Sequence, residues 1–115
     1  MLSQGHAFAP PVDVYETDTD VVVKMELAGV SRESISVTVE GDLIRLAGER
    51  RDTQAGGQRV YHQLEISYGS FQRSLRLPAP VASDQATAKY DQGFLIITLP
   101  RQRPARPDPT AVPIA

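Results

Sequence analysis

The residue types that catalyse reactions or bind metals are few in this chain and are not grouped in a recognised pattern. The two histidines, His6 and His62, are far apart, and neither belongs to a His/Asp/Glu cluster at metal-ligand spacing. Serine and aspartate are plentiful, but no nucleophile elbow or Ser-His-Asp context is present. The Gly56-Gly57 pair lacks the rest of a phosphate-binding loop or dinucleotide fingerprint. The sequence therefore predicts a protein that is not an enzyme and that takes no cofactor or metal.

A group of acidic residues near the start of the chain has two interpretations. Asp13, Glu16, Asp18 and Asp20 could bind a cation, or they could keep a sheet edge solvated and discourage aggregation. The second interpretation is favoured, because charged residues commonly protect exposed strand edges.

Length, charge and cysteine content limit the class of protein. The chain has 115 residues, no cysteine and a net charge of -2. This length suits one domain, and the missing cysteines exclude disulfides, thiol catalysis and cysteine-based zinc sites. The charge gives no electrostatic reason to expect nucleic-acid binding. No apolar run approaches the roughly 18 residues of a membrane span, and no basic start followed by an apolar block marks a signal peptide. We expect a soluble cytoplasmic domain.

Apolar and polar residues alternate with a period of two along most of the chain, which predicts β-strands. In the clearest example, Val21, Val23, Met25 and Leu27 occupy one face. The other alternating segments lie within residues 12–15, 35–39, 44–46 and 71–77. Short strands separated by turn signals, with no long amphipathic helix, predict an all-β, immunoglobulin-like antiparallel β-sandwich.

The segment 86–100 should form a hairpin. A short strand over 86–90 meets an Asp-Gln-Gly turn, in which Gly93 supplies the positive φ that the turn requires. Leu95, Ile97 and Leu99 then share the inner face of a strand over 94–99, and Pro100 ends that strand because it lacks a ladder donor. Gly48, inside another strand, predicts a bulge or a close approach.

Residues 50–59 have no apolar face and are predicted to form a long loop. Val60, Tyr61 and His62 follow as a small β-prone island without a local partner. Such an island could pair with the sheet edge of another chain.

The predicted domain covers residues 12–100, between two segments that lack periodicity. Residues 1–11 form a short arm, which is either a disordered start or an apolar segment that contacts partners. Residues 101–115 contain four prolines and should be extended and exposed. This tail ends in Val112, Pro113 and Ile114. Apolar residues at the end of a polar, exposed tail indicate that this end docks on a protein surface.

Taken in order, these segments resemble the small heat-shock protein family, which is built on the α-crystallin domain, in its bacterial and plant type. The residues that carry the resemblance include Ala88, Gly93 and Leu95, which match the family's Ala-x-x-x-x-Gly-x-Leu signature. The other matches are Pro11 to Glu16, Glu26 to Val30 (with Ala28 where proline is usual), Ile44 to Arg50, Tyr68 to Pro78, and Val112 to Ile114 for the C-terminal Ile-x-Ile anchor.

The resemblance implies an ATP-independent holdase that binds unfolding client proteins. It also implies that the protein forms homodimers, which can assemble further into higher oligomers. It implies that the β-prone island pairs with the first strand of a partner and that an arginine lies at the dimer interface; an exposed strand position remains the alternative for that arginine. The implied interface residues are Val12, Asp13, Val14, Tyr15, Val60, Tyr61, His62 and Arg73. The anchor would dock in a groove lined by Val37, Val39, Ala86 and Ala88, each of which could instead be an ordinary core residue.

The sequence departs from this family at its start. The family's N-terminal arm is usually much longer and apolar, and it carries much of the client binding. Either part of an arm is missing here, or this is a short form that stops at small assemblies. The same β-sandwich also suits two other classes of protein: an adaptor domain that binds a larger chaperone, and an adhesive β-sandwich module. The loop strand and tail anchor argue against the first, and the absence of a signal segment or repeat argues against the second.

Overall fold

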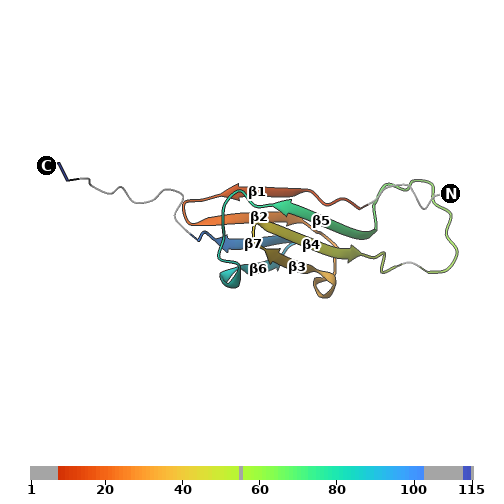
Figure 1. Cartoon of the computed structure of the whole chain (residues 1–115). Coiled ribbons are helices and arrows are strands. Elements are labelled where there is room, and N and C mark those ends of the chain that lie inside the picture. Colours follow the sequence, from red (N-terminus) through yellow and green to blue (C-terminus); the bar gives the residue numbers. More distant parts are fainter. Residues whose placement is uncertain (1–7, 55, 103–112, 115) are drawn as a thin grey trace.

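The computed structural model describes residues 8–54, 56–102 and 113–114, and these form seven strands and two short 3-10 turns (Figure 1). The turns are η2 (Arg32–Ser34) and η3 (Ser83–Gln85). The strands are β1 (Val12–Glu16), β2 (Asp20–Glu26), β3 (Ser36–Glu40), β4 (Leu43–Arg50), β5 (Gly69–Arg76), β6 (Thr87–Asp91) and β7 (Phe94–Pro100). The predicted all-β fold is confirmed, with boundaries that differ by a few residues.

The strands make two antiparallel sheets, ordered β1-β2-β7-β6 and β3-β4-β5. The sheets pack face to face as a sandwich, with β5 beside β1 and β3 beside β6 (Figure 1). In the described part of the chain, β1 and β6 are the edges of the first sheet, and β3 and β5 are the edges of the second. The sandwich therefore has open edges on both of its long sides.

The core lies between β2 and β7 of one sheet and β4 and β5 of the other. The predicted inner faces are confirmed: Val21, Val23, Met25 and Leu99 are fully buried, and Leu95 and Ile97 are almost so. They pack in one cluster with Ile44, Leu46, Phe71 and Leu77. Burial of alternate side chains removes apolar surface from water and fixes the register of each strand.

Two glycines allow other atoms to approach the backbone closely. Gly93 has φ of 83° and its carbonyl accepts a 2.6 Å hydrogen bond from the Leu27 amide. A Cβ there would lie 3.1 Å from the backbone of Ala28. At Gly48 the pairing with Phe71 leaves no space, since a Cβ would lie 2.7 Å from the ring. The predicted turn glycine is thus confirmed, and Gly48 is a close approach with continuous pairing around it.

The connection between β4 and β5 is the longest in the domain and spans residues 51–68 (Figure 1). The predicted long loop is confirmed and extends further than residue 59. Val60, Tyr61 and His62 lie outside any strand of the single chain and are exposed. Their pairing with another chain stays a prediction.

Candidate functional site

The outer edge of β1 is the first candidate surface. Within the described residues no strand pairs with this edge. Val14 points to the core side, because its register partner Val23 is fully buried, yet Val14 itself is 38% exposed. Tyr15, on the opposite face, is also exposed. The second sheet therefore leaves part of the inner face of β1 uncovered, next to a row of unpaired backbone groups.

The long loop presents a set of exposed apolar side chains, the second candidate surface. Val60 is 83% exposed and Ile66 is 66% exposed, and Leu64 and Tyr68 are exposed as well. Sequence reasoning singled out only Val60 to His62 and missed Leu64 and Ile66. The missed signal is an alternation that continues through even-numbered positions from Val60 to Tyr68. A strand built from this segment would carry one apolar face.

Arg73 is half-buried on β5, on the side that faces the first sheet. Its guanidinium Nη1 donates a 3.3 Å hydrogen bond to the carbonyl of Pro10. Among the described residues it makes no ion pair with a carboxylate. The structure thus places Arg73 between the sheets near the start of β1, and not at a fully exposed strand position.

A groove between the edge strands β3 and β6 is the third candidate surface. Val37, Val39, Ala86 and Ala88 line one hollow of about 360 Å³. A second hollow shares Val37 and Ala88 and continues along the same two strands, past Arg32, Ile35, Lys89, Tyr90 and Leu95. All four residues predicted to line a groove therefore meet at one groove. Val37, Val39 and Ala86 also pack against the hydrophobic core. These three residues therefore line the groove and belong to the edge of the core as well.

Hydrogen bonds across the sandwich hold the two sides of this groove together. The Tyr90 hydroxyl of β6 lies 2.6 Å from the Leu27 carbonyl and 2.9 Å from the Val30 carbonyl, in the segment that leads to β3. Arg32 of η2 donates a 3.3 Å hydrogen bond to the Tyr90 carbonyl. These contacts bind β6 to the segment 27–32 that leads into β3, and so fix one end of the groove.

The predicted tail anchor is only partly described. Val112 lies outside the described residues, and Pro113 and Ile114 are exposed, Ile114 at 97%. The described end of the anchor is therefore not docked in the groove of its own chain.

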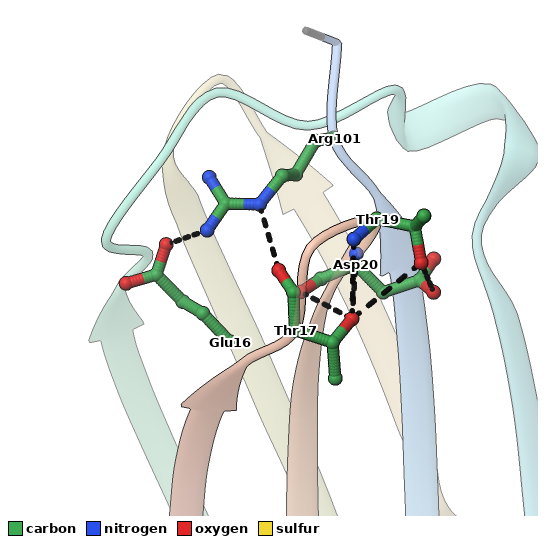
Figure 2. Close-up of polar contacts among 5 residues, drawn as sticks. All are labelled: Glu16, Thr17, Thr19, Asp20 and Arg101. Atoms are coloured by element: carbon green, nitrogen blue, oxygen red, sulfur yellow. Dashed lines mark hydrogen bonds and ion pairs between the residues drawn. The ribbon is translucent and has the colours of Figure 1, made fainter. Parts of the chain in front are cut away.

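The root of the tail is clamped to the turn between β1 and β2 (Figure 2). Arg101 donates from Nε to the Thr17 carbonyl at 3.1 Å, and its Nη2 makes an ion pair with Glu16. Its backbone amide donates to the Thr19 carbonyl at 2.9 Å. Its side chain is only 11% exposed. The end of β7 and the end of β1 are thus one connected unit.

The turn that receives Arg101 is itself closed by hydrogen bonds. The Thr17 hydroxyl accepts from the Asp20 amide at 3.0 Å, and the Thr19 hydroxyl donates to the Asp20 carboxylate at 2.7 Å (Figure 2). Glu16 and Asp20, two of the four acidic residues near the start of the chain, are therefore engaged with protein partners. In the part of the chain that the structure describes, no three His, Cys, Asp or Glu side chains come together as a metal site.

An antiparallel sandwich with two open sides, a long exposed loop and an edge groove is the architecture of an α-crystallin domain. Residues 13–115 match the model of the Hsp20/alpha crystallin family. The chain belongs to the Hsp20/alpha crystallin family. Across the described residues, no helix is long and apolar enough to cross a membrane.

Similar proteins come from bacteria, plants and a fungus. The chain is 32% identical over 93 residues to small heat shock protein C2 of Rickettsia felis, an alignment that covers 81% of this chain and 60% of that protein. It is 36% identical to a 16.6 kDa heat shock protein of Oryza sativa, covering 90% of this chain and 72% of the relative. The structure of heat shock protein 16.0 from Schizosaccharomyces pombe is similar with a TM-score of 0.80 and 26% identity, covering 93% and 99% of the two chains.

The tail clamp predicts an unequal effect of two arginine substitutions on stability. Arg101→Ala removes two side-chain contacts from a largely buried position and should lower the free energy of unfolding by about 1 kcal/mol. Arg76→Ala removes a 72% exposed arginine from its ion pair with Asp42 and should change it by less than about 0.5 kcal/mol. Urea unfolding of both variants measures the difference. Equal losses of unfolding free energy in the two variants would contradict a stabilising role for the Arg101 contacts.

Proposed function

We propose that this protein is an ATP-independent holdase, which binds unfolding proteins and prevents their aggregation. Membership of the Hsp20/alpha crystallin family supports a chaperone role. The single observation that carries the proposal is the apolar surface that the single chain leaves uncovered at its edges and on its loop, which assembly covers and which opening of the assembly on heating would expose to clients. Uncovered apolar surface binds other polypeptides. No step of this activity requires catalysis, and the absence of cysteine is compatible with the reducing cytoplasm, which we propose as its compartment.

The proposed building block is a homodimer formed by loop exchange. The segment around Val60, Tyr61 and His62 of one subunit would add as a strand to the edge formed by Val12, Asp13, Val14 and Tyr15 of the other. Backbone pairing satisfies the unpaired groups of β1, and apolar loop residues cover the exposed inner face of Val14. Arg73 lies close to this edge, through its contact with Pro10, and is proposed as an interface residue.

The proposed link between dimers is the tail. Val112, Pro113 and Ile114 would enter the groove between β3 and β6 of a neighbouring subunit, against Val37, Val39, Ala86 and Ala88. Burial of the two branched side chains contributes at most about 1.5–3 kcal/mol each. The cost of ordering the tail offsets part of this, although Pro113 limits that cost. One tail is therefore a weak link, and several together make a lasting assembly that can open on heating.

Aggregation of a heat-labile enzyme tests the holdase activity. Light scattering of citrate synthase at its unfolding temperature should fall when this protein is added at a near-stoichiometric ratio without ATP. Serum albumin at equal mass is the control for non-specific protection. Undiminished scattering would contradict the proposed activity.

Deletion of residues 56–63 tests the loop exchange. The shortened loop cannot reach a partner, so the variant should be a monomer by light scattering after size-exclusion chromatography. A second variant keeps the loop length and replaces Val60, Tyr61 and His62 with Gly-Ser-Gly. This variant should also weaken the dimer. A deletion variant that stays dimeric would rule out exchange through this loop.

Replacement of Val112 and Ile114 by glycine tests the tail link. The double variant should lose the species larger than the dimer, because the apolar contacts in the groove are removed. Glycine at Thr110 and Ala111 is the matched control, since it adds similar flexibility next to an intact anchor. Native mass spectrometry measures both, and an unchanged distribution in the anchor variant would contradict the docking.

A further inference from the structure

Phe8, the first described residue of the chain, occupies a defined site on the body of the domain. Its ring centroid lies 4.0 Å from the guanidinium carbon of Arg50. The same ring meets the Phe71 ring edge to face, at a centroid distance of 5.6 Å and an angle of 87°. Phe8 is half-buried and contacts the hydrophobic core cluster. We call the surface formed by Arg50 and Phe71 the Phe8 seat.

Arg50 is built to present the face of its guanidinium to an aromatic ring. Its Nε and Nη2 both donate to the Ser67 carbonyl, at 2.9 and 2.5 Å, and its Nη1 donates to the Ala28 carbonyl at 3.2 Å. These neutral acceptors fix the plane of the group. Among the described residues no carboxylate forms an ion pair with it. Its charge is therefore available to an aromatic face, on which arginine stacks well.

The other wall of the seat is equally fixed. Phe71 is only 5% exposed and lies against Gly48, where even a methyl group would not fit beside the ring. An edge-to-face pair with Phe71 is a favoured aromatic geometry. The seat thus offers a cation face and a ring edge, a combination that selects an aromatic side chain over an aliphatic one.

Phe8 can leave this seat without unfolding the domain. The chain is fixed after it, because Pro10 is fully buried and its carbonyl accepts the hydrogen bond of Arg73. The Pro11 carbonyl accepts a 3.1 Å hydrogen bond from Glu26. Ala9, between Phe8 and this fixed point, is exposed. Among the described residues, release of Phe8 therefore breaks only the contacts of Phe8 itself.

We propose that the Phe8 seat is a binding site for an aromatic side chain of an unfolded polypeptide, and that Phe8 closes it in the resting chain as an internal competitor. The chemistry of the ligand follows from the residue that already fills the site. The identity of the ligand as a client rests on the holdase activity proposed above, whereas the existence of the seat does not.

Competition by Phe8 has a measurable consequence. The apparent dissociation constant of an outside ligand is the intrinsic one divided by the fraction of chains whose seat is open. If Phe8 fills the seat for at least about four-fifths of the time, its removal strengthens apparent binding at least about fivefold.

The experiment titrates the full chain with N-acetylphenylalaninamide and follows the backbone amides of Gly48 and Phe71 by NMR. Phe8→Ala should bind this probe at least about fivefold more tightly than the unchanged chain. Phe94→Ala is the matched control, since Phe94 also lies over a cation, Lys24 at 4.6 Å, but is remote in sequence from the seat. N-acetylcyclohexylalaninamide should bind Phe8→Ala more weakly than the aromatic probe. Equal affinities for Phe8→Ala and the unchanged chain would overturn the proposal.

A second measurement keeps the proposal testable if Phe8→Ala does not fold. The unchanged chain carrying 4-fluorophenylalanine at position 8 should show a fluorine resonance that moves toward its free position as N-acetylphenylalaninamide is added. A resonance that does not move would overturn the internal competition. The movement should not depend on protein concentration, and a dependence would mean that a second copy fills the seat, which also overturns it. Loss of holdase activity alone would contradict the proposed function and leave these readings unchanged.

Discussion

Unpaired strand edges are the constraint on which the rest of this structure depends. A two-sheet sandwich buries its inner faces but cannot pair the outer backbone groups of its edge strands. In the part of the chain that the structure describes, β1 and β6 leave one sheet open, and β3 and β5 leave the other open. Each open side also has uncovered apolar surface. At the β1 edge this is the inner face around Val14, and between the β3 and β6 edges it is the groove. The assembly that we propose through these edges would pair these backbone groups with a second copy of the chain.

Single arginines connect the edges to the segments that leave the domain. Arg101 ties the root of the tail to the end of β1, and Arg50 ties the two ends of the long loop to the turn at Ala28. Arg73 holds the segment before β1 at the Pro10 carbonyl. A planar group with several donors can bind backbone carbonyls on separate segments at once. The tail, the loop and the start of the chain therefore leave the body from fixed points.

Much of the fold could be predicted because burial leaves a local trace in the sequence. The alternation from Val21 to Leu27 and from Leu95 to Leu99 predicted both central strands of one sheet, and both are confirmed as buried. Gly93 predicted the β6–β7 turn, where its φ of 83° is required. Leu64 and Ile66 were missed, although their alternation with Val60 was available. The groove residues were named from the resemblance, and period two alone would not have separated them from core positions.

The sequence by itself determined the class of fold, the strands, the turn glycines and the absence of any recognised catalytic pattern, since each depends on neighbouring residues. Only the tertiary structure decided which distant residues meet. It placed Glu16 beside Arg101, Phe8 over Arg50 and Phe71 against Gly48. It also showed that Gly48 admits an aromatic ring without a bulge. Such contacts join residues far apart in the chain, and they follow from how the two sheets stack, which no local period encodes.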